Sequence, residues 1–101
     1  MATKRTNEQL ATLGARIRDA VTEAYLETGK SLDAPAIAAR LGWSESKLRM
    51  VMEELRGAPA GVHAHRDYRD SSSRQVLVYA PATWHLRDLL NAARAAAKSA
   101  S

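Results

Sequence analysis

The segment 34–55 constrains the fold more than any other part of this 101-residue chain. Before Gly42 its apolar side chains recur on one face of a short helix, and after Gly42 they recur at i, i+3, i+4 and i+7. Glycine ends helices readily because it adopts the left-handed conformation without steric cost. The spacing therefore predicts two short helices joined by a tight turn, with these core residues: Ile37, Ala38, Leu41, Trp43, Leu48, Val51, Met52 and Leu55.

Polar residues mark the points where three helices are expected to begin. Asp33 and Ser44 precede the two short helices, and an oxygen of either side chain can accept a backbone N–H of the first turn. Thr6 and Gln9 have the spacing of a capping box, and an apolar stripe with helical spacing follows them to about residue 28. The sequence thus predicts one longer helix before the two short ones.

The composition changes at residues 57–61, where the sequence GAPAG cannot continue a helix. Residues 62–68 then alternate in polarity, and residues 75–80 are rich in β-branched and aromatic side chains, which predicts an antiparallel hairpin. Beyond Pro81, Thr83 is expected to cap a last helix from Trp84, which either closes the core or docks on a second subunit. We expect both Trp43 and Trp84 to be core residues.

The pattern of Ile37, Ala38, Leu41, Gly42, Trp43, Leu48 and Val51 resembles the helix-turn-helix of bacterial and phage DNA-binding regulators. With the hairpin that follows, the chain is similar to the winged-helix family over about residues 8 to 80. The expected class is α+β, mostly α, with a three-helix core, a β-hairpin wing and a C-terminal helix. Its expected parts are a disordered basic tail (1–5), a winged helix-turn-helix domain (6–81), a C-terminal helix that is a candidate dimerisation element (82–97) and a frayed tail (98–101).

This resemblance implies a homodimer that binds double-stranded DNA, most simply as a transcriptional repressor, at half-sites about 34 Å apart. The second helix of the motif would enter the major groove, where Arg49 can pair with guanine at a gain of about 1–3 kcal/mol in discrimination. The expected recognition-helix contacts are Ser44, Glu45, Ser46, Lys47, Arg49, Met50 and Glu53. The expected contacts to the DNA backbone are Arg66, Arg69, Ser72 and Arg74 from the wing, and Lys4 and Arg5 from the tail.

The charge balance is compatible with DNA binding and also leaves an alternative open. The 15 lysines and arginines outnumber 11 acidic residues, and the resulting net charge of +4 favours a polyanionic partner. The recognition helix itself is nearly neutral, however, and Glu53 has the i, i+4 spacing to pair with Arg49. The alternative is therefore a winged-helix module for protein–protein interaction or assembly, such as a phage or plasmid maintenance component.

The sequence contains little that supports other classes of function. The chain has no cysteine, no apolar run long enough to span a membrane and no phosphate loop or nucleophile motif, so we expect a cytoplasmic, nucleoid-associated protein that is not an enzyme. His63 and His65 share one side of a strand, but two histidines with only His85 and scattered carboxylates are a weak metal motif. We expect no metal or cofactor, and whether a small-molecule effector exists is unknown from the sequence.

Overall fold

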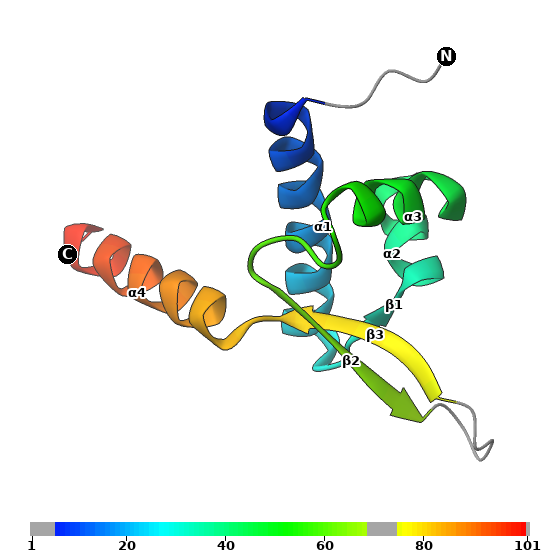
Figure 1. Cartoon of the computed structure of the whole chain (residues 1–101). Coiled ribbons are helices and arrows are strands. Elements are labelled where there is room, and N and C mark those ends of the chain that lie inside the picture. The colour runs from blue at the N-terminus through cyan, green and yellow to red at the C-terminus, as the bar shows by residue number, and fades with distance from the viewer. Residues whose placement is uncertain (1–5, 69–74, 101) are drawn as a thin grey trace.

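The computed structural model describes residues 6–68 and 75–100, which form a mostly helical α+β fold (Figure 1). The expected coarse fold class is thereby confirmed. The elements, in chain order, are α1 (Asn7–Thr28), β1 (Leu32–Asp33), α2 (Ala34–Leu41), α3 (Glu45–Glu54), β2 (Val62–Tyr68), β3 (Gln75–Pro81) and α4 (Thr83–Ala100).

Local capping chemistry sets the beginnings of the first three helices, as the sequence predicts. The amide of Gln9 donates to Thr6 Oγ1 at 3.1 Å, and the amide of Thr6 donates to Gln9 Oε1 at 2.9 Å, which completes the capping box. At α2 the amide of Ala36 donates to Asp33 Oδ1 at 3.0 Å. These bonds satisfy amides that a helix start leaves without an intrahelical partner.

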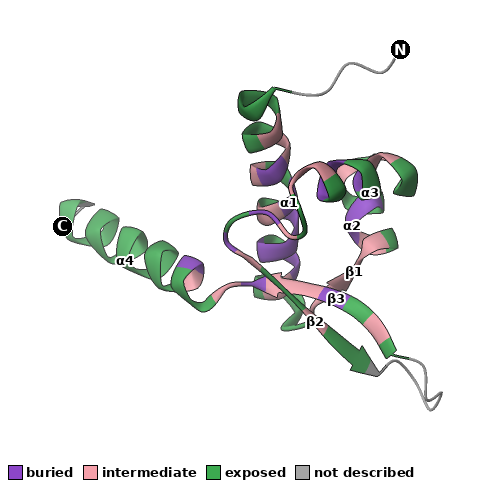
Figure 2. Cartoon of the chain, in the orientation of Figure 1, coloured by how far each residue is buried: buried purple, intermediate pink, exposed green. Residues whose placement is uncertain are grey.

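The core lies where α1, α2 and α3 meet (Figure 2). Apolar side chains with helical spacing on each helix meet there, and burial of such side chains is the main favourable term in folding. The buried cluster consists of Ile17 and Val21 from α1, Ile37 and Ala38 from α2, and Leu48, Val51 and Met52 from α3.

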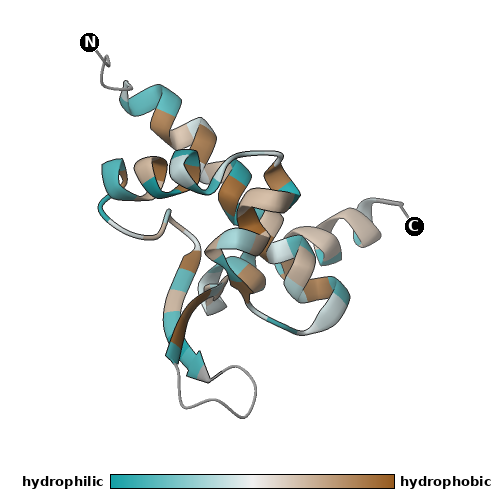
Figure 3. Cartoon of the chain, turned by 90° about the vertical axis from the view of Figure 1, so that its right-hand side faces the viewer, coloured by the Kyte–Doolittle hydropathy of each residue, from teal (hydrophilic) through white to brown (hydrophobic). Residues whose placement is uncertain are grey.

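A three-stranded antiparallel sheet with the order β1-β3-β2 closes one side of this core. The predicted hairpin is confirmed, with Val62 opposite Pro81 at its base and Tyr68 opposite Gln75 at its far end. β1 is a two-residue strand, and it pairs Leu32 with Tyr79. Figure 3 shows that β3 is apolar along most of its length, whereas β2 alternates between polar and apolar residues. β3 accordingly occupies the centre of the sheet.

The last helix, α4, leaves the body on the side away from α2 and α3 (Figure 1). It begins at Thr83, so Ala82, and not the expected Thr83, precedes its first turn, and the Ala82 carbonyl accepts the amides of His85 and Leu86. The helix continues to Ala100, beyond the expected end at residue 97. From Arg87 to Ser99 every residue is exposed, as Figure 2 shows. Hence α4 contributes little to the core of the monomer.

One prediction about the core is wrong. The Trp84 side chain is 53% exposed, although we expected both tryptophans to be buried. Trp43 does pack against the core cluster. Trp84 stays outside because it points about 100° away from His85, the residue of the same turn that is buried against the body. None of the described helices is long and apolar enough to cross a membrane.

Candidate nucleic-acid interface

The turn between α2 and α3 fixes the direction in which α3 leaves the core. Gly42 has φ 71°, the left-handed conformation that ends α2, and its amide donates to carbonyls of the preceding turn. The amide of Trp43 donates to the carbonyl of Ala38 at 2.9 Å, and Ser44 Oγ accepts the amide of Lys47 at 3.1 Å. These bonds hold both sides of the turn, so α3 begins in a defined orientation against α2.

One side of α3 is buried and the opposite side is free to contact another molecule. Leu48, Val51 and Met52 face the core. At about 100° per residue, the side opposite them carries four exposed side chains. We call this set the exposed face of α3, and it consists of Ser46, Arg49, Met50 and Glu53. Ser44 and Glu45, also expected to contact DNA, are exposed at the start of the same helix.

Within α3, Arg49 forms an ion pair with Glu45 and not with Glu53 as the sequence spacing suggested. The Arg49 Nη2–Glu45 Oε2 distance is 3.4 Å, and the two side chains are 73% and 48% exposed. An ion pair this exposed contributes about 0–1 kcal/mol. It therefore costs little for Arg49 to leave Glu45 and contact another partner.

Lys47 lies apart from the exposed face of α3. Its Nζ is 4.7 Å from the centroid of the Trp43 ring, and the guanidinium carbon of Arg16 is 5.7 Å from the same centroid. Two cations near one aromatic ring are attracted by its electron-rich face. This contact holds the half-buried Lys47 beside the turn at the start of α3, where a lysine is suited to contacting phosphate and not a base edge.

Strand β3 of the hairpin borders the same hollow as Arg49 of α3. Arg66 is exposed and pairs across the hairpin with Leu77, so the two side chains project from the same face of the sheet. Leu77 and Arg49 both line a shallow hollow of about 410 Å³ between α3, the start of α2 and β3. Arg49 therefore shares this hollow with Leu77, and Arg66 is the residue opposite Leu77 on the neighbouring strand, outside the lining of the hollow.

Tyr79 also lines this hollow, and burial raises the pKa of its hydroxyl above the ordinary value of 10.0. The ring packs against the core cluster, so the uncharged form of the side chain is the one suited to this position. Tyr79 is a structural part of the surface.

Several of the expected DNA contacts lie outside the described residues. They are Arg69, Ser72 and Arg74 at the tip of the hairpin, and Lys4 and Arg5 at the N-terminus. The expected wing contact within the described part of the chain is Arg66.

The histidine pair on β2 does not form part of a larger ligand cluster. The rings of His63 and His65 stack with centroids 5.7 Å apart, and His65 Nδ1 is buried without a hydrogen-bond partner among the described residues. In residues 6–68 and 75–100, no three histidines, cysteines or carboxylates are grouped closely enough to hold a metal ion. His85 is buried at the start of α4, next to Gly61.

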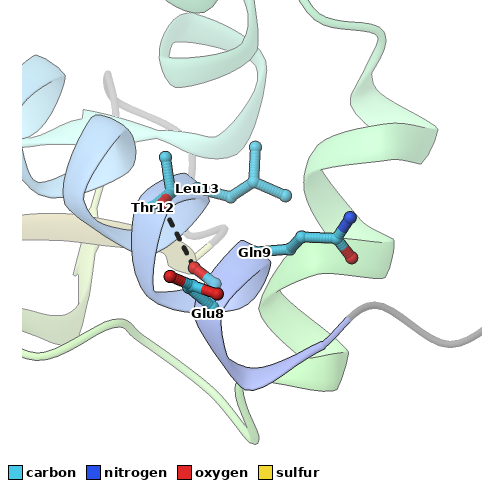
Figure 4. A pocket seen from close by; sticks show the side chains of 4 residues that line it. All are labelled: Glu8, Gln9, Thr12 and Leu13. Carbon is cyan, nitrogen blue, oxygen red and sulfur yellow. Dashed lines mark hydrogen bonds between the residues drawn. The ribbon is translucent and has the colours of Figure 1, made fainter.

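A second hollow, of about 490 Å³, lies along the first two turns of α1 (Figure 4). Its described lining consists of Glu8, Gln9, Thr12 and Leu13. Thr12 Oγ1 donates to the carbonyl of Glu8 at 3.1 Å, and the Gln9 side chain is engaged in the capping box. The Thr12 hydroxyl and the Gln9 side chain thus take part in helix structure. Among the described residues of this hollow, no base is paired with a nucleophile.

Sequence reasoning missed the contact that joins α4 to the body. Gly61 has φ 86°, and a Cβ on it would lie 2.9 Å from Arg18 Cδ and 3.4 Å from His85 Cγ. Its carbonyl accepts the amide of Ala82 at 2.8 Å. From the sequence, the glycines of GAPAG indicated only a turn. The residues that contact Gly61 are distant in the sequence, so this close packing could not be predicted.

Comparison with models of known protein families, with curated proteins and with solved structures finds no match for this chain. The candidate site is therefore defined by its own geometry, which consists of a fixed α3, its exposed face and the neighbouring hairpin.

Proposed function

We propose that this chain is a winged-helix protein that binds double-stranded DNA and acts as a small prokaryotic or phage transcriptional repressor. The observation that carries the proposal is the hollow that Arg49 of α3 lines together with Leu77 of β3, the residue opposite the exposed Arg66 in the hairpin. A helix and a neighbouring β-hairpin arranged in this way can contact a groove and the adjacent backbone at the same time.

In this proposal the exposed face of α3 reads base edges in the major groove. Arg49 donates to guanine O6 and N7, Met50 contacts a thymine methyl group, and Glu53 accepts from a cytosine amino group. Because the ion pair of Arg49 with Glu45 is exposed, the guanidinium can exchange that partner for a base.

Cations around this face would supply the sequence-independent part of the affinity. Lys47 lies beside the turn at the start of α3, and Arg66 is exposed on the hairpin. Each cation that neutralises a phosphate releases condensed counterions. Such contacts determine where the protein sits on the duplex but carry no base information. The wing tip and the N-terminal tail are expected to add further phosphate contacts.

A second candidate function is a winged-helix module for protein–protein interaction. The observation that favours it is the mixed character of the same surface, because Met50 and Leu77 are 49% and 47% exposed beside the acidic Glu45 and Glu53. Exposed apolar side chains next to charges of both signs suit a protein partner as well as DNA.

One experiment separates the two functions. Binding of the full chain to random-sequence duplex DNA is measured over a series of salt concentrations. DNA binding predicts an affinity that falls linearly on a log–log plot, with a slope that reports the number of phosphate contacts. Absence of binding at low salt overturns the proposal and favours the interaction module. If binding is found, selection from a random duplex library then identifies the preferred site.

A further inference from the structure

Beyond its first turn, the helix α4 carries an apolar face that nothing in the described monomer covers. Leu89 and Leu90 are 41% and 51% exposed, and every residue from Arg87 to Ser99 is exposed. On a helical wheel the apolar residues share one arc, whereas Arg87, Asp88, Arg94 and Lys98 lie on the other. We call this arc the apolar face of α4, and it consists of Leu86, Leu89, Leu90, Ala92, Ala93, Ala96 and Ala97.

The sizes of the side chains on this face change along the helix in a way that specifies a partner. All three leucines lie in the first half of the face, and the positions beyond Leu90 are alanines. A parallel copy of α4 would set leucine against leucine at one end and alanine against alanine at the other, which leaves the second end underpacked. An antiparallel copy sets the leucines of each helix against the alanines of the other, so that the two axes stay evenly spaced.

We propose that the apolar face of α4 binds the same face of a second copy of this chain, with the two helices antiparallel. A two-fold axis across the middle of α4 makes this contact self-complementary, as is usual in homodimers. No charged side chain lies on the apolar face, so pairing removes no charge from water. The antiparallel arrangement also brings the opposite ends of the two helix dipoles together.

The size of α4 predicts the strength of this dimer. Its 18 residues form a helix about 27 Å long, and pairing of two such helices buries roughly 1,000 Å² in total, near the low end of specific protein interfaces. We therefore expect a reversible dimer whose population depends on protein concentration. This contact would supply the second subunit for a two-half-site operator, but it does not depend on DNA binding.

The test measures the oligomeric state of the full chain without DNA, by sedimentation velocity over a wide range of concentrations. The wild type should shift from monomer to dimer mass as its concentration rises. Replacing both Leu89→Glu and Leu90→Glu should leave a monomer at all concentrations. The matched control is Ala95→Glu, which adds a negative charge to the opposite side of α4 and should leave the dimer intact. Circular dichroism verifies that each variant keeps its helical content.

The orientation is tested with engineered cysteines, since the natural chain has none. A mixture of Leu86→Cys and Ala96→Cys chains should form a disulfide-linked heterodimer under mild oxidation, because an antiparallel pair can bring these positions together. Ala96→Cys chains alone should not cross-link efficiently. A wild type that stays monomeric, or a dimer that survives both glutamates, overturns the proposed contact. Efficient cross-linking of Ala96→Cys with itself overturns the antiparallel orientation. Either result leaves the test of DNA binding unaffected.

Discussion

The ammonium group of Lys47 lies 4.7 Å from the centroid of the Trp43 ring, beside the turn that joins α2 to α3. Because of this contact, the side chains of Lys47 and Arg49 have different surroundings, although the two residues are only two positions apart. Lys47 is held against the body of the protein, whereas Arg49 projects from the exposed face of α3. If the chain binds DNA, these two cations should therefore have different effects on binding.

Replacing Lys47 with alanine should weaken binding to all duplexes by a similar factor and lower the salt slope by about 1, because the change removes one phosphate contact. The check is the salt series repeated on two unrelated sequences. Arg16→Ala is the matched control, since Arg16 also lies near the Trp43 ring but on α1. The salt slope of the Arg16→Ala variant should equal that of the wild type. A loss confined to one sequence would show that Lys47 reads bases.

Replacing Arg49 with alanine should instead relax sequence preference. The affinity for the selected site should fall by about 1–3 kcal/mol, while the affinity for random duplex changes much less. Competition binding with the selected and scrambled sites measures the difference. Arg94→Ala removes a cation from α4 and serves as the control that should keep the preference. Equal weakening on both duplexes would assign Arg49 to phosphate contact.

The wing should contribute to affinity without contributing to sequence preference. Replacing Arg66 with alanine is expected to lower the salt slope by about 1, and replacing Arg69 and Arg74 together by up to about 2. The measurement is the same salt series on random duplex. Unchanged slopes in both variants would remove the hairpin from the binding surface.

The close packing around Gly61 leads to a prediction about stability. Gly61→Ala should lower the free energy of unfolding by about 2–4 kcal/mol, because a Cβ there combines a left-handed φ with a 2.9 Å approach to Arg18 Cδ. Gly29→Ala is the control, since Gly29 has φ 71° but nothing within 4 Å of its added Cβ. That substitution should cost only about 1 kcal/mol. Urea denaturation compares the two, and equal costs would show that the side chains around Gly61 move aside freely.

Tyr79 should make the stability fall at alkaline pH. Burial raises the pKa of this hydroxyl above 10.0 in the folded chain, so the unfolded state ionises first as the pH increases. Stability from this group is complete below pH 10 and declines as the pH rises through the folded pKa. In Tyr79→Phe the decline above pH 10 should be smaller. The measurement is the free energy of unfolding as a function of pH, and parallel curves for the two proteins would contradict the assignment.

Features that depend on neighbouring residues could be predicted from the sequence. Thr6, Asp33 and Ser44 cap their helices as expected, because each bond reaches only three positions along the chain. The hairpin was predicted for a similar reason, since alternating polarity and a polar break specify the two strands. The DNA-binding role of the exposed residues stays a prediction.

Features that depend on the direction of an element in space could not be predicted. Trp84 looked like a core residue, but it lies on a side of α4 that does not face the body. His85, one position further, is buried against Gly61, a partner 24 positions earlier in the chain. The ion pair of Arg49 with Glu45 depends on side-chain rotamers, because Glu45 and Glu53 both have the necessary spacing.

The joint between β3 and α4 consists of the single residue Ala82, and hydrogen bonds to Gly61 and to the first turn of α4 hold it on both sides. Such a short joint couples the direction of α4 to the sheet. In a dimer paired through α4, the length of this helix would then fix the distance and the relative rotation of the two rigid bodies. One residue inserted near its start would move each body by about 1.5 Å and turn it by about 100°. The length of α4 would thus set which spacing and phasing of half-sites on DNA both copies can reach together.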